Sequence, residues 1–137
     1  MHRHSSIPKQ RTRGRLNVEK LTYGLIGCGR IAPNHITAAM NNADALEVVA
    51  LCDPVQEHAE KILSFLPEEK RASVRMYEDY REMLRDGAPT LVSIATESGK
   101  HASIGLDCLE AGCNVIIEKP IALSMDDARA LVAKAKE

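Results

Sequence analysis

Apolar positions along the chain alternate between short β-branched runs and longer stretches with helical spacing. The short runs predict five strands, over residues 21–26, 45–52, 73–77, 90–96 and 113–120. The intervening stretches predict helices over residues 32–43, 54–66, 78–86, 100–112 and 124–137. Strands that alternate with helix-length crossovers are typical of a parallel sheet covered by helices on both faces. The predicted fold class is therefore α/β, a doubly wound parallel sheet.

The strands differ in how far they are expected to be buried. Residues 90–96 ("TLVSIAT") are apolar enough to be covered on both faces, whereas residues 73–77 ("SVRMY") are weakly apolar and predict an edge strand. The usual order of such sheets calls for a sixth strand after the last helix. The sequence supplies five strands, and we expect the sixth strand and any second domain to be absent from this chain.

Residues at the helix ends support these boundaries. Pro33 is tolerated in a first helical turn, where no backbone N–H bond is lost. Gly112 is expected to end the helix over 100–112, and Ser124 to cap the start of the last helix.

Charge is unevenly distributed over the 137 residues. Residues 1–20 carry six basic side chains and one acid, which predicts a flexible basic tail, interpreted as a solvated leader rather than a dock for nucleic acid or acidic lipid. The remainder, residues 21–137, has 12 basic and 18 acidic side chains, a net charge of −6. An acidic body argues against a nucleic-acid surface on the fold.

Cysteines and apolar runs bear on the cellular location. The four cysteines form no C-x-x-C pair and lie in apolar stretches: Cys28, Cys52, Cys108 and Cys113. This favours buried, reduced thiols in a cytoplasmic protein over disulfides or a zinc site. No apolar run has the length of a membrane span or a secretory signal. His2 and His4 are too few for a metal site, and none is predicted.

The stretch "GCGRIA" carries the first candidate chemistry. Gly27 allows a tight turn out of the first strand, Gly29 lets the backbone approach a pyrophosphate, and Ala32 permits close helix packing. The loop residues predicted to hold the cofactor are Gly27, Cys28, Gly29, Arg30 and Ile31. The competing interpretation is a plain strand-to-helix turn, because this motif alone is a weak signal.

Asp53 strengthens the dinucleotide interpretation. It ends the second strand, about twenty residues after Ala32, where a carboxylate can accept hydrogen bonds from the adenosine ribose. Its charge opposes a 2′-phosphate and so predicts NAD, although Arg30 could pair with that phosphate and leave NADP possible. The alternative role for Asp53 is the N-cap of the helix that follows, ahead of Pro54, and one residue could serve both roles.

Two later stretches, "IATESGKHA" (94–102) and "IIEKP" (116–120), follow the fourth and fifth strands at the same sheet edge. With these motifs, residues 21–137 resemble the amino-terminal NAD(P)-binding Rossmann domain of the Gfo/Idh/MocA oxidoreductases. The resemblance implies that Thr96 and His101 line the cofactor cleft and that Glu118 lies near the nicotinamide ribose. It also implies that Lys119 is catalytic, taking the proton of a substrate hydroxyl, and that Pro120 follows a cis peptide bond.

Simpler roles remain open for these residues. Glu118 and Lys119 could form a surface ion pair, and His101 could face solvent at a helix start. His35 is expected to pack or meet solvent rather than face the cleft. Many family members have proline where this chain has Glu97, which places an acid near the cleft.

By resemblance, the parent protein would be an NAD(P)-dependent dehydrogenase acting on a secondary alcohol of a sugar, cyclitol or nucleotide-sugar. The family's second domain supplies most substrate contacts and the oligomer interface, so we expect a homo-oligomeric parent enzyme. The isolated chain is expected to bind NAD weakly and to be inactive. The alternatives are a stand-alone nucleotide-binding or regulatory module and, with a poorer fit to "EKP", an S-adenosylmethionine-dependent methyltransferase.

Overall fold

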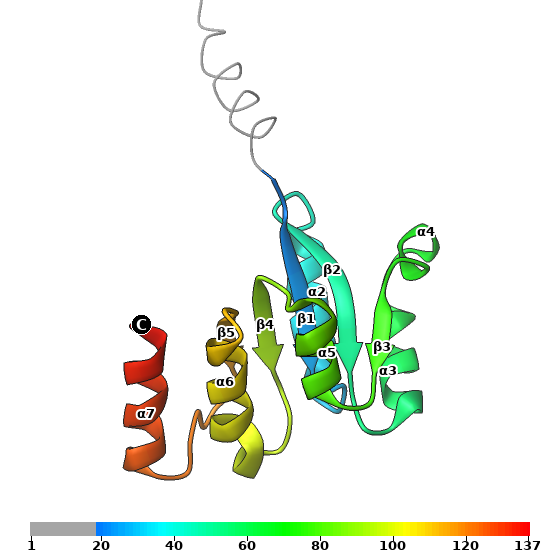
Figure 1. Ribbon diagram of the computed structural model, residues 1–137. Coiled ribbons are helices and arrows are strands. Elements are labelled where there is room, and N and C mark those ends of the chain that lie inside the picture. The colour runs from blue at the N-terminus through cyan, green and yellow to red at the C-terminus, as the bar shows by residue number, and fades with distance from the viewer. Residues whose placement is uncertain (1–18) are drawn as a thin grey trace, which may run out of the picture.

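A five-stranded parallel sheet forms the centre of the protein (Figure 1). The structure is a computed structural model and describes residues 19–137, so the predicted tail falls almost entirely outside the described residues. The strands are β1 (Leu21–Ile26), β2 (Leu46–Cys52), β3 (Arg75–Tyr77), β4 (Leu91–Ile94) and β5 (Asn114–Ile117). Their order is β3-β2-β1-β4-β5, which confirms the doubly wound α/β fold and the edge position of β3.

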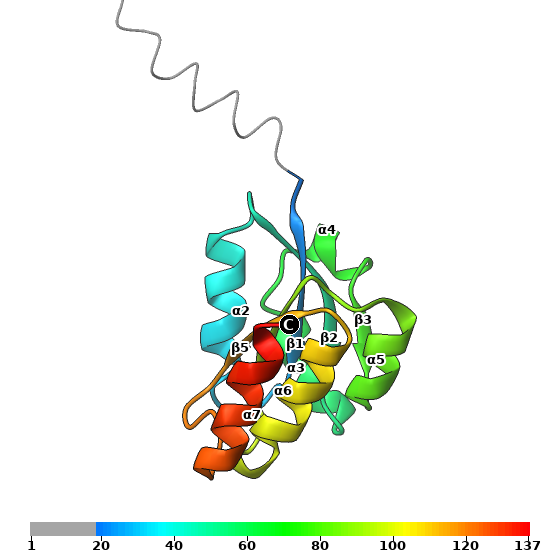
Figure 2. The same ribbon diagram turned by 60° about the vertical axis from the view of Figure 1, so that its left-hand side comes forward.

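Helices cover both faces of this sheet. They are α2 (Ala32–Asn41), α3 (Gln56–Leu63), α4 (Glu68–Arg71), α5 (Tyr80–Gly87), α6 (His101–Glu110) and α7 (Met125–Ala135), with a 3-10 turn, η1 (Ser98–Lys100), before α6. Figure 2 shows α2 and α5 on opposite sides of the sheet. The last helix, α7, packs beside α6.

Two aliphatic cores lie on the two faces. Leu25 of β1 packs with Ile36 of α2 and Ile62 of α3 on one face. Val92 of β4 packs with Met83 of α5 and other residues of α5 and α6 on the opposite face. β1 and β4 are thus covered on both sides, as the apolar sequence of residues 90–96 predicts for β4.

The α3 region differs from its prediction at both ends. The helix begins at Gln56 rather than at residue 54, because the carboxylate of Asp53 accepts the N–H of Val55 and Val55 stays extended. After Leu63 the chain continues in tighter turns, and the single-turn helix α4 follows. No residue of α4 is buried, so it leaves no apolar period in the sequence.

The predicted helix ends at residues 112 and 124 are confirmed. Gly112 has φ +93°, and its N–H donates to the carbonyl of Leu109 at 3.0 Å. The N–H of Cys113 donates to the carbonyl of Cys108, also at 3.0 Å, which completes a Schellman motif. Ser124 Oγ accepts the N–H of Asp127 at 3.1 Å and caps α7.

Candidate cofactor-binding site

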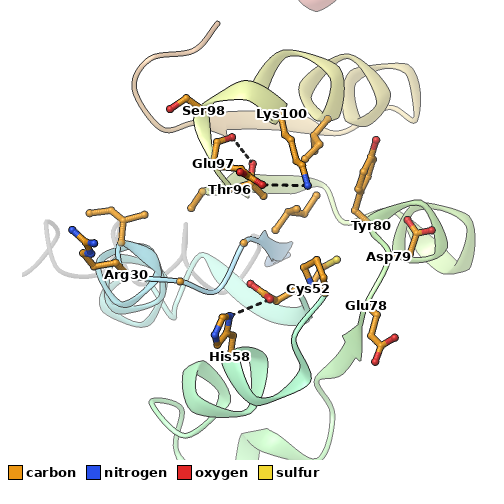
Figure 3. Close-up of a pocket in the computed structure, with 18 of the residues that line it drawn as sticks. Arg30, Cys52, His58, Glu78, Asp79, Tyr80, Thr96, Glu97, Ser98 and Lys100 are labelled. Atoms are coloured by element: carbon orange, nitrogen blue, oxygen red, sulfur yellow. Dashed lines mark hydrogen bonds and ion pairs between the residues drawn. The ribbon is translucent and has the colours of Figure 1, made fainter. Parts of the chain in front are cut away.

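A cavity of about 1080 Å³ opens at the carboxyl ends of the central strands (Figure 3). Four loops form most of its walls, each following a different strand. The residues that they contribute are Gly27, Gly29, Arg30 and Ile31 after β1, Cys52, Asp53 and Pro54 at β2, Glu78–Arg81 after β3, and Ala95–Ser98 after β4. Ligands of open parallel α/β sheets bind at this edge.

The loop after β1 requires glycine at its first position. Gly27 has φ +96°, and a Cβ added to it would lie 2.6 Å from the backbone carbon of Ala95. The ends of β1 and β4 therefore come together only because Gly27 lacks a side chain. A Cβ on Gly29, in contrast, would have no atom within 4 Å, because Gly29 borders the open cavity.

Unpaired backbone donors gather where this loop enters α2. Within residues 19–137, the N–H groups of Gly29, Arg30 and Ile31 donate no hydrogen bond. No side chain caps α2, whereas α5 and α7 are capped by Asp79 and Ser124. Free N–H groups at a helix N-terminus bind anions such as phosphate, so the loop fits a pyrophosphate group.

The carboxylate of Asp53 is held in place by backbone groups. Its Oδ2 accepts the N–H of Cys28 at 2.9 Å, and its Oδ1 accepts the N–H of Val55 at 2.8 Å. The predicted alternative is wrong, because Val55, not Asp53, is the N-cap residue of α3. Nδ1 of His58 lies 3.3 Å from Oδ1, the dashed line at His58 in Figure 3. Each carboxylate oxygen can accept more than one hydrogen bond, so Asp53 can also accept hydrogen bonds from ribose hydroxyls.

The thiols near this carboxylate are not reactive groups. Burial, with a smaller contribution from the charge of Asp53, raises the pKa of Cys28 to about 12 and that of Cys52 to about 12. Both remain protonated near neutral pH and act as apolar side chains. Cys108 and Cys113 are also buried and free, as predicted.

Thr96 and His101 lie at the far side of the cavity. Thr96 lines it, whereas His101 is only 1% exposed and does not line it. Nδ1 of His101 lies 2.7 Å from the carbonyl oxygen of Pro120, and Nε2 lies 2.8 Å from the carbonyl oxygen of Thr96. The solvent-facing alternative for His101 is therefore wrong. Its ring joins the loop after β4 to the loop after β5.

Glu118 and Lys119 lie outside the lining of the large cavity. Lys119 is exposed, and its peptide bond to Pro120 is cis, as the resemblance implies. Glu118 Oε2 lies 2.6 Å from Nε2 of His35, so its partner is a histidine of α2 and not Lys119. Both residues of this pair line a second cavity, of about 360 Å³, beside α2.

The sequence interpretation missed several residues at these cavities. Glu78–Arg81 line the large cavity beside Pro54 and His58. The guanidinium of Arg81 stacks over the ring of Tyr80 at 4.8 Å. The topology could have indicated these residues, because the loop after β3 lies at the same sheet edge as the loops after β1 and β2.

Comparison with known proteins agrees with this geometry. The family model described as "Oxidoreductase family, NAD-binding Rossmann fold" matches residues 21–137. D-apiose dehydrogenase of Paraburkholderia graminis is 36% identical over 116 residues, covering 85% of this chain and 29% of the relative. Inositol 2-dehydrogenase of Salmonella typhimurium is 29% identical over 112 residues, covering 82% of this chain and 32% of the relative.

A similar solved structure is that of the WlbA dehydrogenase from Bordetella pertussis in complex with NADH and UDP-GlcNAcA. It superposes with a TM-score of 0.77 at 30% identity, over 86% of this chain and 34% of that protein. The chain thus spans about a third of the length of the relatives that it matches. No helix within residues 19–137 has both the length and the apolar character needed to cross a membrane.

Proposed function

Because this chain belongs to the Gfo/Idh/MocA oxidoreductase family through its NAD-binding Rossmann domain, we propose that residues 21–137 bind NAD in the large cavity and serve a dehydrogenase. The observation that carries the proposal is the hydrogen bond between the glycine loop and Asp53. It places unpaired N–H groups and a fixed carboxylate at neighbouring points of one cavity. A pyrophosphate and an adjoining ribose need this pair of partners.

Each loop has a distinct role in this proposal. The N–H groups of Gly29, Arg30 and Ile31 bind the pyrophosphate, with Gly27 and Cys28 shaping the turn. Asp53 accepts hydrogen bonds from the adenosine ribose. The stacked side chains of Tyr80 and Arg81 border the adenine end, since they follow the strand beside β2.

The same carboxylate sets the preference between NAD and NADP. A 2′-phosphate on the adenosine ribose would bring negative charge against Asp53, which is already fixed by two N–H donors. Arg30 lines the cavity, is exposed and is free to reach a phosphate. We therefore assign NAD as the preferred cofactor and NADP as a weaker ligand.

The remaining residues act at the reacting end. When bound, NAD supplies the acceptor for a hydride that leaves the carbon of a secondary alcohol. Lys119 is assigned to accept the proton of the alcohol's hydroxyl as the hydride leaves, which gives a carbonyl product. His101 supports this end because its buried ring lies between the carbonyls of Thr96 and Pro120, the residue that follows Lys119.

The proposed substrate is a sugar, a cyclitol or a nucleotide-sugar. Relatives are named for apiose and inositol, and the similar solved structure contains UDP-GlcNAcA. Since these relatives are about three times longer, we assign most substrate contacts and homo-oligomer formation to a further domain of the parent protein. Residues 21–137 alone are then expected to bind NAD without turnover, because hydride transfer also needs a positioned substrate.

Calorimetric titration of the chain tests this function. We expect NAD to bind, NADP to bind more weakly and S-adenosylmethionine not to compete. Gly29→Ala is the matched variant, because the added methyl projects into the cavity and meets no protein atom within 4 Å. Absence of NAD binding by the wild-type chain, or equal binding by Gly29→Ala, would contradict the proposal.

Preferential S-adenosylmethionine binding would favour a methyltransferase. NAD binding with no turnover by a longer parent protein would favour a regulatory module.

A further inference from the structure

We propose that His35 is a positioning residue for the nicotinamide half of the cofactor and acts by holding the carboxylate of Glu118. This inference rests on the proposed NAD site. It assigns a role to a histidine that the sequence interpretation left to packing or solvent.

The contact joins two distant parts of the chain. His35 lies in the first turn of α2, directly after the glycine loop, and Glu118 directly follows β5. Their side chains meet at 2.6 Å, although 83 residues separate them. The N–H of Glu118 also donates to the carbonyl of Ile94 at 3.0 Å, which fixes its backbone to the end of β4. The pair therefore links the pyrophosphate helix to the strand end that carries Lys119.

Charge and burial favour a directed interaction. The side chain of His35 is 12% exposed and that of Glu118 is 33% exposed, so the contact is partly shielded from water. The hydrogen bond from His35 is the main cause that lowers the pKa of Glu118, so the group is a carboxylate at neutral pH. A carboxylate only accepts hydrogen bonds, and therefore Nε2 of His35 carries the donated proton.

Position along the sheet indicates which half of the cofactor is affected. Asp53 lies at the end of β2 and Glu118 at the end of β5, with β1 and β4 between them. Three strand spacings separate these ends by about 14 Å. A dinucleotide that begins at Asp53 and crosses the glycine loop on β1 extends toward β4 and β5. Glu118 thus lies on the side of the second ribose and not of the first, next to the large cavity and not in its lining.

The test compares two ligands and two substitutions of one residue. ADP reaches Asp53 and the glycine loop but has no nicotinamide ribose, whereas NADH has both halves. His35→Ala removes the donor to Glu118. His35→Gln keeps an N–H donor at the position of Nε2. Asn34→Ala, on the neighbouring exposed residue of α2, is the control for the helix itself.

Calorimetry is expected to separate the variants. His35→Ala should weaken NADH binding about tenfold, the loss of roughly one hydrogen bond to a charged group, and leave ADP binding unchanged. His35→Gln and Asn34→Ala should bind both ligands as the wild type does. Adding Glu118→Gln to His35→Ala should cause no further tenfold loss, because the two residues act as one unit.

Three outcomes overturn the inference while leaving the NAD site intact. In the first, His35→Ala weakens ADP and NADH equally, which shows a role in folding alone. In the second, NADH binding is unchanged in His35→Ala. In the third, the losses from His35→Ala and Glu118→Gln are fully additive. If the wild-type chain binds neither ADP nor NADH, the proposed function itself fails and the inference fails with it.

Discussion

The backbone N–H of Cys28 donates to Oδ2 of Asp53 at 2.9 Å, joining the glycine loop to the end of β2. The carboxylate thereby shapes the loop as well as facing the cavity. Asp53 is 8% exposed, so its remaining accessible surface is small and directed to this site.

Replacing Asp53 should change cofactor preference more than stability. Asp53→Asn keeps an oxygen for one N–H donor but removes the negative charge. We expect NAD affinity to fall about tenfold and the ratio of NADP to NAD affinity to rise, because repulsion of a 2′-phosphate is lost. Calorimetric dissociation constants for both cofactors measure this. Glu57→Gln, an acid of α3 outside the cavity lining, should leave the ratio unchanged. An unaltered ratio in Asp53→Asn would count against the assigned preference.

Alanine substitutions of the two loop glycines should differ in their effect on stability. Gly27→Ala forces a Cβ to within 2.6 Å of the backbone of Ala95 at φ +96° and should cost about 3 kcal/mol of unfolding free energy. Gly29→Ala meets no atom and should alter stability by less than about 0.5 kcal/mol. Urea unfolding compares the two. Equal stabilities would show that the close approach of β1 and β4 is not rigid.

His101 should matter for stability through its two carbonyl partners. A neutral imidazole has one N–H, so His101→Leu removes the buried donor to one of the two carbonyls that its ring contacts, those of Thr96 and Pro120, at a cost of about 1–3 kcal/mol. His101→Gln retains an amide donor and should cost less. Thermal unfolding at fixed pH distinguishes the variants, and an equal loss in both would mean that ring packing, not hydrogen bonding, is the main contribution.

Removing the α7 cap should destabilise the domain modestly. Ser124→Ala deletes the acceptor for the N–H of Asp127 and should cost about 1 kcal/mol. Ser124→Asp supplies another acceptor and should restore most of that loss. Chemical denaturation provides both values. A Ser124→Ala variant as stable as the wild type would show that the last helix does not unfold together with the sheet.

The titration of Glu118 reports on its contact with His35. The hydrogen bond from His35 holds the pKa of Glu118 below its ordinary value of 4.5. The stability that this contact contributes is therefore present above pH 4.5 and lost as the pH falls through the lower, folded-state pKa. Carbon-detected NMR should show the Glu118 pKa rising toward 4.5 in His35→Ala. Glu110, whose pKa is lowered by Lys134, should titrate unchanged in that variant. A wild-type pKa at or above 4.5 would contradict the contact.

The spacing of apolar residues along the sequence was sufficient to predict most of the fold. All five strands and five of the helices were predicted from apolar spacing, because most of them bury a face or stripe; the edge strand β3 is an exception, since none of its residues is buried. α4 could not be predicted in this way because its single turn buries nothing. The glycine loop and Asp53 were also predictable, because both follow adjacent strands at short, regular spacing.

Contacts between residues far apart in the sequence could not be predicted from the local sequence pattern. The contact between His35 and Glu118 depends on how α2 lies over the end of β5, a relationship set by tertiary packing. The burial of His101 likewise depends on the loop at Pro120, 19 residues away in the sequence. Neither residue has a neighbouring motif that distinguishes a buried hydrogen-bonded histidine from an exposed one.

The position of β1 at the centre of the sheet has a consequence for synthesis of the protein. β1 pairs with β2 on one side and with β4 on the other, and β4 ends at Ile94. One edge of the strand that precedes the glycine loop therefore stays unpaired until residue 94 has left the ribosome. Nonlocal parallel pairing of this kind is slow. Nascent chains that stall before residue 94 should expose this edge, which makes them targets for chaperones and for aggregation.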